Sequence, residues 1–431
     1  MVTGPRRPVR VAVLARVIYP WHGYGGLQRH VYDLVRCLLG RGAEVTLITQ
    51  PASRDHPVDP RTDATFRHSK LTVRLVPYRT FPMAGRRGTT VIDRSTAYPI
   101  FGWRAGRLAP ALAASGAVDV VHGLGASALG YAMARRTPGG RQVPFVFNPQ
   151  GMEEFGATDP SRAPLKRIGY WPLRQAVVRC ARAADRVIAT DQVLVTSVLE
   201  HLKVPRASVV VIPNAIELAD YDTTGVPARI DALRRRVGLS ADDVLLLSVG
   251  RIEANKGFHV LARALGTLVA DGTLPASGWR WVLVGDGPLR ARLERDIAAS
   301  GLAVHAHLRG RAADDELVDW YRAATLFVHP TLYEGSSLVT LEAMACARAV
   351  VATMAGGLPD KVTPGVSGWL VPPGDPVALA DALREAIANR QRLQSMGVAG
   401  RTIVEHEFSW RTATDRLLEL YYELVYAGDT A

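Results

Sequence analysis

The chain of 431 residues is 48% hydrophobic and 21% charged, and it carries a formal net charge of +12. This composition is typical of a folded soluble protein, and the length predicts two domains. No apolar run reaches the ~18–20 residues that a membrane-spanning helix needs, and residues 1–10 lack the apolar core of a secretory signal, so neither is expected. Cys37, Cys180 and Cys346 lie too far apart for a metal site, which predicts buried thiols in a cytoplasmic setting.

The first half of the sequence predicts a parallel α/β domain. Residues 10–15 form a short apolar run that is typical of a buried strand, and a glycine-rich loop follows at 17–26. Apolar residues then recur at helical spacing from Leu27 to Leu39, before a strand at 45–49. Further strands are expected at 72–76, 118–121, 145–148, 186–189 and 209–212. A strand, glycine loop, helix and strand form a βαβ unit, the seed of a doubly wound sheet.

The second half repeats this alternation after a polar connection that begins at Pro213. A strand is expected at 244–249, a glycine-rich loop at 250–257 and a helix at 258–270. More strands are expected at 281–285, 307–309, 326–329, 349–352 and 369–371, and helical periodicity from Trp410 to Tyr426 closes the chain. We therefore predict two Rossmann-like doubly wound domains, 1–213 and 214–409, that face a central cleft, and a C-terminal helix, 410–431, that packs back on the first domain.

Several common nucleotide and metal motifs are absent from the sequence. Neither half carries the G-x-G-x-x-G fingerprint followed by an acid, and neither a P-loop nor an H-E-x-x-H motif occurs. No histidine or cysteine cluster has ligand spacing, so no metal is expected. These absences argue against a dinucleotide enzyme, a P-loop ATPase and a zinc protease.

Two loops that follow strands are suited to bind an anion. Arg251 and Lys256 lie in a loop between a predicted strand and a predicted helix. These two cations and the helix N-terminus could together bind a diphosphate without the help of a metal ion. The alternative is a pair of surface cations near a turn. At the matching place in the first half, Gly25 and Gly26 let the backbone approach an anionic group closely.

One histidine and two glutamates complete the set of candidate residues. His122 follows the strand at 118–121, where a histidine can hydrogen-bond a reacting hydroxyl, although a lone histidine is more often structural. Glu334 begins a loop after the strand at 326–329, and Glu342 lies eight positions later on an apolar, helix-like run. The alternative for this pair is a solvated loop acid and an acid on a helix surface.

Taken together, these segments resemble the retaining family-4 glycosyltransferases, which have the GT-B fold. The resemblance spans essentially the whole chain, and its motifs are specific when they occur in this order. They are Gly25-Gly26, 119–122, 211–214, 249–257, 284–288, 330–345, and 368–371 with 373–375. The resemblance implies an α/β GT-B fold and transfer of a sugar from a nucleotide-diphosphate donor, UDP-, GDP- or dTDP-linked, with no cofactor.

The resemblance also implies roles for individual residues. The first domain would bind the acceptor and the second the donor. Arg251 and Lys256 would stabilise the leaving diphosphate, and Glu334 would hold hydroxyls of the transferred sugar. Glu342 would accept hydrogen bonds from the ribose, and the Gly25-Gly26 loop would close over the diphosphate. The donor-binding set is completed by Gly335, Ser336, Ser337 and Leu338.

The chain also departs from the family pattern. Ser336 and Ser337 stand where an aromatic residue and a glycine are common, so the donor sugar is not assigned. Leu124 stands where many members have a second histidine, which leaves His122 as the one histidine of that motif with a catalytic role. Ala347 replaces a common glycine, and Asp360 replaces a common glutamate.

The charge is unevenly distributed, +17 over residues 1–213 and −5 over 214–431. In this family the acceptor is often lipid-linked, so the basic half predicts peripheral contact with an anionic membrane from the cytoplasmic side. The stretch singled out for it is Arg162, Lys166, Arg167, Tyr170, Trp171, Arg174, Arg179 and Arg182. A soluble acceptor with merely exposed arginines is the alternative.

Other functions remain as alternatives to a glycosyltransferase. A GT-B epimerase would act on the nucleotide sugar itself, and a non-catalytic paralogue would bind the nucleotide sugar only. No base-stacking motif supports nucleic-acid binding, so no nucleic-acid partner is expected. The sequence predicts no oligomeric state.

Overall fold

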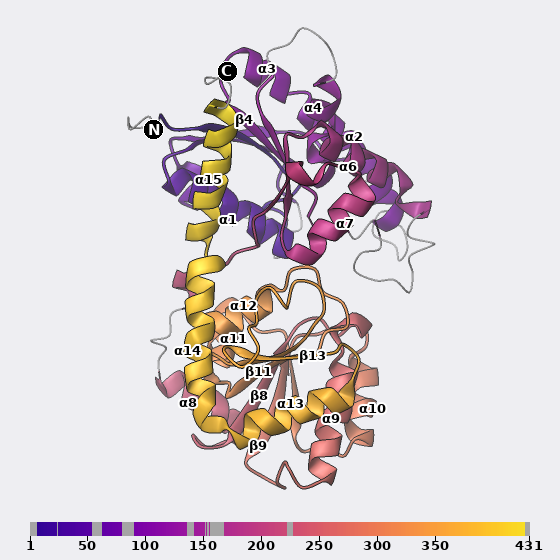
Figure 1. Ribbon diagram of the computed structural model, residues 1–431, viewed down its shortest axis with the longest axis vertical. Coiled ribbons are helices and arrows are strands. Elements are labelled where there is room, and N and C mark those ends of the chain that lie inside the picture. The colour runs from indigo at the N-terminus through magenta and orange to yellow at the C-terminus, as the bar shows by residue number, and fades with distance from the viewer. Residues whose placement is uncertain are drawn as a thin grey trace. The chain divides into compact units, whose positions relative to one another are not determined.

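The structure, a computed structural model, describes residues 7–23, 25–53, 63–79, 90–135, 142–150, 152, 155, 168–221 and 227–426. The chain forms two compact units (Figure 1). Unit 1 consists of Met1–Asn214 and Trp410–Ala431, and unit 2 consists of Ala215–Ser409. The sequence-based boundary at residue 213 lies one residue from the end of the first segment.

Unit 1 is built on a parallel sheet that, among the described residues, has seven strands in the order β3-β2-β1-β4-β5-β6-β7. Its central strand β1 pairs with β2 on one side and with β4 on the other, so the direction of winding reverses between β1 and β4. The strands are β1 Arg10–Leu14, β2 Glu44–Thr49, β3 Leu71–Leu75, β4 Val120–Leu124, β5 Phe145–Asn148, β6 Arg186–Ala189 and β7 Val209–Val211.

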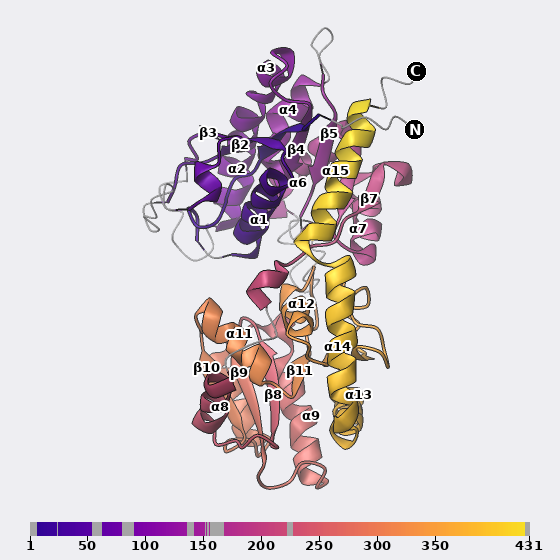
Figure 2. The same cartoon turned by 90° about the vertical axis from the view of Figure 1, so that its left-hand side faces the viewer.

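Helices cover both faces of this sheet (Figures 1 and 2). α2, α4 and α6 pack against one another on one face, and α1 packs against α15 on the other. α1 buries Val31, Leu34, Val35 and Leu38, the stripe that its helical spacing predicts. The helices are α1 Gly26–Gly40, α2 Thr90–Gly106, α3 Ala109–Ala114, α4 Leu129–Ala134, α6 Trp171–Ala183, α7 Gln192–Leu202 and α15 Trp410–Tyr426.

Unit 2 repeats the design with a parallel sheet of six described strands in the order β10-β9-β8-β11-β12-β13. Here the winding reverses between β8 and β11, which pair with each other. The strands are β8 Val244–Val249, β9 Trp279–Val284, β10 Ala306–Gly310, β11 Leu326–His329, β12 Val350–Thr353 and β13 Gly368–Val371.

The sheet of unit 2 separates two apolar cores. Because side chains alternate along a strand, Leu246 packs beneath α9, α10 and α13, whereas Leu245 and Leu247 pack beneath α8, α11, α12 and α14 (Figure 1). This two-sided burial explains why β8 is apolar along its whole length. The helices are α8 Pro227–Arg236, α9 Phe258–Ala270, α10 Arg290–Ala299, α11 Asp314–Ala323, α12 Leu338–Ala345, α13 Pro376–Ala388 and α14 Arg390–Glu407.

The predicted α/β class with two doubly wound parallel sheets is confirmed. One strand differs from its prediction in a way that matters for the site. β4 does not stop at Val121 but continues to Leu124, because Val121–Leu124 remain paired with β5. His122 therefore lies inside the strand rather than after it. Over the described residues, every helix is too short or too polar to cross a membrane.

Candidate active site

The candidate site of unit 2 lies at the carboxyl edge of its sheet, between the loops that follow β8 and β11. This is where the winding reverses, the usual place for a ligand in an open α/β sheet. Lys256, from the loop after β8, donates through Nζ to Oε2 of Glu334, from the loop after β11, at 2.6 Å. The sequence predicted both residues as donor-binding groups, and the fold brings them into direct contact.

Gly257 explains how the two loops approach so closely. Its φ of +67° is left-handed, and an added Cβ atom would lie 1.9 Å from the carbonyl oxygen of Pro330. Only glycine satisfies both conditions. Beside it, the amide of Leu332 donates to the carbonyl of Asn255 at 2.7 Å, so backbone contacts lock the two loops together.

The Glu334 carboxylate accepts two hydrogen bonds on one of its oxygens. Besides Lys256, the Nε2 atom of His329 lies 3.1 Å from the same Oε2 atom. A carboxylate can only accept, so Nε2 carries the proton of this imidazole. Within the described part of the chain Oε1 has no hydrogen-bond partner, which leaves it for the hydroxyl of a ligand.

Neighbouring groups keep Glu334 ionised despite its burial. Burial alone raises the pKa of this carboxyl group, but the hydrogen bond from His329 and the charge of Lys256 outweigh it and lower the pKa to about 2. Burial also lowers the pKa of His329, against the effect of Glu334, so this imidazole is neutral at pH 7. His329 was not predicted as a site residue; its place at the end of β11, five residues before Glu334, was the available clue.

Arg251 lies in a different environment from Lys256. Its side chain is 70% exposed, and Nη2 lies 3.0 Å from Oε1 of Glu253, its ion pair among the described residues. Lys256 is by contrast only 18% exposed. An exposed pair such as Arg251–Glu253 contributes little to stability and separates easily, so the Arg251 guanidinium can move to a ligand.

The loop from Gly335 to Ser337 leads into α12. Ser337 caps that helix, because its hydroxyl accepts from the amide of Thr340 at 3.4 Å. The amides of Gly335, Ser336 and Ser337 have no hydrogen-bond acceptor among the described residues, and Leu338 is the first residue of the helix. Unpaired amides at a helix N-terminus favour an anion or a hydroxyl oxygen.

A buried lysine lies beneath this loop. Lys361, 1% exposed, donates through Nζ to Oγ of Ser336 at 3.2 Å and to the carbonyl of Gly357 at 3.1 Å. Gly356 has a left-handed φ of +54°, and a Cβ atom there would lie 1.8 Å from the carbonyl oxygen of Glu334. The segment that carries Lys361 is therefore packed directly on the Glu334 loop. Asp360 departs from the family pattern in the sequence, but no motif marked Lys361.

Glu342 lies on α12 and is held by the neighbouring helix α11. The hydroxyl of Tyr321 donates to Oε2 of Glu342 at 2.7 Å. Burial, and then the charge of Glu342, raises the pKa of Tyr321 well above its usual value, so the phenol keeps its proton and stays a donor. The carboxylate is half-buried, which is compatible with a contact to a ligand hydroxyl.

The residues predicted in unit 1 lie at the corresponding edge of the other sheet. Gly25 caps α1 with extended backbone and Gly26 is the first residue of the helix, so the pair lies at a helix N-terminus after β1. Tyr24, which precedes them, lies outside the described residues. Neither glycine has a left-handed φ, and a Cβ atom on Gly25 would meet only the flexible end of Gln28.

His122 is a buried residue of β4. Its Nδ1 atom lies 2.5 Å from the hydroxyl of Tyr421 on α15, and Nε2 is buried without a partner among the described residues. Burial, assisted by His30, lowers the pKa of His122 to about 3, so the imidazole is neutral at pH 7. The expected place just beyond a strand end is wrong, because the strand continues past it.

The described residues hold no group of three or more histidine, cysteine, aspartate or glutamate side chains that is placed to bind a metal ion. Cys180 and Cys346 are buried thiols, as the sequence predicts, whereas Cys37 is only half-buried.

Comparison with known proteins decides the family. Residues 24–220 match the family model for glycosyltransferase family 4, and residues 243–389 match the model for glycosyl transferases group 1. The chain is 30% identical over 439 residues to the D-inositol 3-phosphate glycosyltransferase 1 of Catenulispora acidiphila, covering 99% of this chain and 98% of that one. This chain belongs to glycosyltransferase family 4. It is a glycosyltransferase of the GT-B type.

Other similar proteins agree with the family 4 assignment. The D-inositol 3-phosphate glycosyltransferase of Thermobispora bispora is 36% identical over 247 residues, a match that spans 56% of each chain. Among solved structures, the sucrose-phosphate synthase of Thermosynechococcus elongatus has a TM-score of 0.71 and 22% identity, and covers 97% of this chain and 100% of that chain. HepE of Anabaena in complex with UDP has a TM-score of 0.70 and 20% identity, over 97% and 100% of the two chains. These two likenesses support the GT-B fold.

Proposed function

We propose that this family 4 glycosyltransferase transfers a sugar from a nucleotide-diphosphate donor to an acceptor hydroxyl, with retention of configuration and without a metal. The observation that supports it most directly is the Lys256–Glu334 contact where the sheet of unit 2 changes direction. In this contact the Lys256 ammonium, which can bind the diphosphate, lies beside the Glu334 carboxylate. The Oε1 atom of that carboxylate has no partner among the described residues and can bind the sugar. The charge and the hydrogen-bonding groups of a nucleotide sugar match this pair.

Each group of the site has a defined task in the proposed reaction. The bond between the sugar C1 and the phosphate oxygen breaks, and the acceptor oxygen bonds to C1 on the same face. The acceptor's proton passes to the departing diphosphate. Lys256 and Arg251 neutralise the charge that develops on the diphosphate, which is usually a large catalytic contribution. Glu334 then orients the sugar through Oε1 and is not the nucleophile.

The remaining donor contacts follow from the position of α12. The free amides of Gly335, Ser336 and Ser337 would bind a phosphate or sugar oxygen at the helix N-terminus. Glu342, fixed by Tyr321, would accept from the ribose hydroxyls. We expect Glu342→Ala to weaken binding of the nucleoside diphosphate alone. An unchanged affinity in calorimetry would exclude the ribose contact.

For the acceptor we propose a phosphorylated polyol such as an inositol phosphate, bound by unit 1. Two similar proteins are named D-inositol 3-phosphate glycosyltransferases. The charge of +17 over residues 1–213 favours an anionic molecule on this part of the chain.

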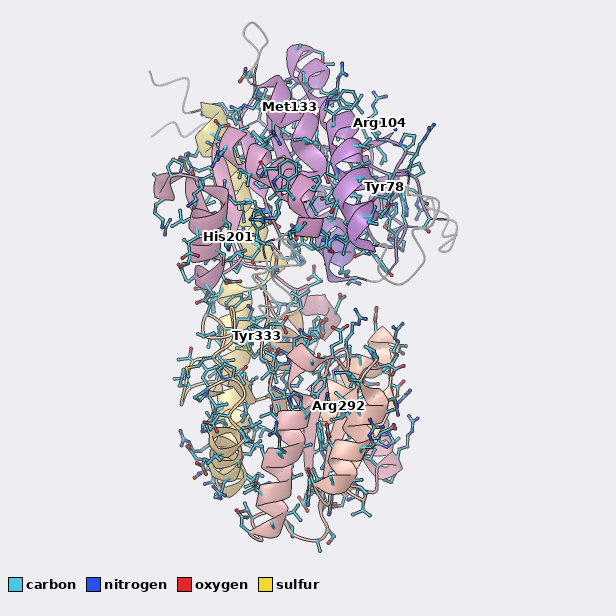
Figure 3. All side chains as sticks on the ribbon, turned by 90° about the vertical axis from the view of Figure 1, so that its right-hand side faces the viewer. Tyr78, Arg104, Met133, His201, Arg292 and Tyr333 are labelled. Atoms are coloured by element: carbon cyan, nitrogen blue, oxygen red, sulfur yellow. The ribbon has the colours of Figure 1, made fainter. Side chains whose placement is uncertain are left out.

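A lipid-linked acceptor is the second candidate, because unit 1 exposes apolar side chains beside arginines. Ile100 and Trp103 of α2 and Met133 of α4 are exposed, and these helices pack against each other. The Arg107 guanidinium lies 4.8 Å above the Trp103 ring, and Figure 3 shows Arg104 and Met133 on these helices. Apolar side chains among cations suit an anionic leaflet.

The stretch that the sequence analysis chose for this contact is only partly described. Arg162, Lys166 and Arg167 lie outside the described residues, Tyr170 is buried, and Trp171 is 61% exposed. Sedimentation with vesicles of phosphatidylglycerol tests the membrane contact of the whole protein. Binding that weakens at high salt supports it, and no binding at low salt would exclude it.

The proposed function is tested by incubating the protein with UDP-, GDP-, ADP- and dTDP-linked sugars and D-inositol 3-phosphate, with and without EDTA. We expect one donor to give a glycoside, insensitive to EDTA, with the donor's anomeric configuration in its NMR spectrum. An inverted product, or activity lost with EDTA, would contradict the mechanism. A sugar epimerised without acceptor would instead establish the epimerase alternative.

A further inference from the structure

Arg16 occupies the position in unit 1 that corresponds to the donor loop in unit 2. It is the second residue after β1, whose carboxyl end lies where the winding of the sheet reverses between β1 and β4. Ligands bind at this edge in open α/β sheets. Arg16 was not predicted as a site residue, although the sequence has a lone cation there, directly after an apolar strand.

Two tyrosines hold the Arg16 guanidinium by their ring faces. Its Cζ atom lies 5.2 Å from the ring centre of Tyr78, labelled in Figure 3, and 5.1 Å from that of Tyr98 on α2. The hydroxyl groups of both rings bind elsewhere. Tyr78 donates to Asp93 at 2.8 Å, and Tyr98 donates to the carbonyl of Leu124 at 3.1 Å. The rings therefore contact the guanidinium without accepting a hydrogen bond from it through their hydroxyl groups.

The N–H groups of Arg16 have no acceptor among the described residues. Nε is buried without a hydrogen-bond partner, and no carboxylate of the described chain forms an ion pair with this side chain. A guanidinium stays charged at any physiological pH, and a buried donor without an acceptor is costly. Its planar fork matches a phosphate or carboxylate through two parallel hydrogen bonds.

We propose that Arg16, which lies over the rings of Tyr78 and Tyr98, binds the anionic group of the acceptor. This inference rests on the proposed function, in which unit 1 takes the acceptor. The shared chemistry is a group with two coplanar anionic oxygens, which a phosphate ester or a sugar carboxylate can supply. Arg16 would hold the acceptor by this group and leave its hydroxyls free to react.

Calorimetry on the full chain tests the proposal with D-inositol 3-phosphate, glucuronate and uncharged myo-inositol as probes. We expect one anionic probe to bind and myo-inositol to bind at least about 10-fold more weakly, since one charge-assisted pair is lost. The phosphate and carboxylate probes distinguish the two sources. If neither anion binds more tightly than myo-inositol, the proposal is overturned.

Two variants and a control link the affinity to Arg16. Arg16→Gln should lower the affinity for the anionic probe about 10- to 100-fold. The affinity of Arg16→Lys should lie between those of the parent and Arg16→Gln, because lysine keeps the charge but lacks the planar fork. Arg74→Gln, which removes an exposed arginine of β3, should bind like the parent. The role of the fork is refuted if Arg16→Lys binds the anionic probe as tightly as the parent, and Arg16→Gln either also binds it as tightly or does not fold.

Nucleoside diphosphate binding in unit 2 should persist in all variants. Its absence from the parent would count against the proposed function instead.

Discussion

The Lys256 ammonium donates to Glu334 Oε2 at 2.6 Å, and this one contact ties the loop after β8 to the loop after β11. The two residues are 78 positions apart in sequence. The same Oε2 atom also accepts from His329, so the carboxylate that holds Lys256 is itself fixed in place. A diphosphate arriving at this edge would therefore meet an ordered cation, and its sugar would meet the free Oε1 atom of Glu334.

Glu334 should stabilise the protein at neutral pH and lose this effect in acid. Its pKa falls from 4.5 to about 2 on folding, so its contribution is complete above pH 4.5 and disappears as the pH falls toward 2. The shift corresponds to about 3 kcal/mol, to order of magnitude. Urea unfolding of the parent and of Glu334→Gln should therefore give a stability difference that shrinks between pH 5 and pH 2.5. A difference that stays constant would show that the carboxylate is not held as described.

His122 should make unit 1 less stable as the pH falls below neutrality. Its pKa is about 3 in the folded chain, whereas the unfolded chain binds the proton near the ordinary value of 6.5. Stability is therefore lost as the pH falls from 6.5 toward 3, by about 2–3 kcal/mol near pH 4.5. His122→Asn should unfold with a weaker acid dependence than the parent in circular dichroism.

Tyr421→Phe tests the same contact from the tyrosine side. It keeps the ring but leaves His122 Nδ1 without its hydrogen bond, so we expect a loss of about 1–3 kcal/mol at pH 7. If Tyr421→Phe is as stable as the parent, the bond contributes nothing. If either variant keeps its fold and loses turnover, His122 has a catalytic role beyond this packing.

Lys361 should act on donor binding through Ser336. An ammonium only donates, so Ser336 Oγ accepts from Lys361. The hydroxyl proton of Ser336 then points to another acceptor, such as an oxygen atom of the nucleotide sugar. We expect Ser336→Ala to lower the affinity for the nucleotide sugar about 3- to 10-fold. Adding Lys361→Met to that variant should lower the affinity little further. Independent, additive losses would show that Lys361 does not act through Ser336.

Arg348→Met is the matched control for Lys361→Met. Arg348 is also a cation of unit 2 that donates to backbone carbonyl groups, those of Cys346 and Ala324, and within the described part of the chain it forms no hydrogen bond with the Glu334 loop. We expect Arg348→Met to lower the thermal unfolding temperature without changing the affinity for the nucleotide sugar.

Ala347 should be replaceable by glycine with a gain in stability. Its φ of +54° is left-handed, a conformation that costs a residue with a Cβ atom about 1–2 kcal/mol. Part of the gain is offset by the greater freedom of glycine in the unfolded chain, so we expect Ala347→Gly to stabilise by about 0.5–1 kcal/mol. A lower midpoint of urea unfolding than in the parent would contradict this.

The regular elements could be predicted from the sequence because their signals are local. The strands 145–148, 186–189 and 326–329 and the helix 258–270 have the predicted bounds, since the strands are almost entirely buried and Gly257 caps the helix. The predicted strand at 118–121 ends too early, because β4 continues through His122 and Gly123 to Leu124. Gly123 is a strand residue, where a Cβ atom would lie 2.4 Å from the Ala128 side chain.

The candidate site was only half visible from the sequence. Lys256, Glu334 and Glu342 were found through the motif in which they stand. His329, Tyr321, Lys361 and Arg16 were missed, because their importance comes from contacts between segments far apart in the chain. Arg251 and Lys256, which look alike in the sequence, differ in burial and partners, and only the packing of the loops sets them apart.

The most direct test of the donor site is calorimetry of the parent and of Lys256→Met with UDP, GDP, ADP and dTDP. We expect one nucleoside diphosphate to bind the parent and to bind Lys256→Met at least about 10-fold more weakly, because the variant removes one charge-assisted contact to the diphosphate. Lys203→Met, on unit 1 beyond the end of α7, should bind like the parent. Equal affinity of parent and Lys256→Met, or no binding of any of the four nucleotides to the parent, would contradict the account.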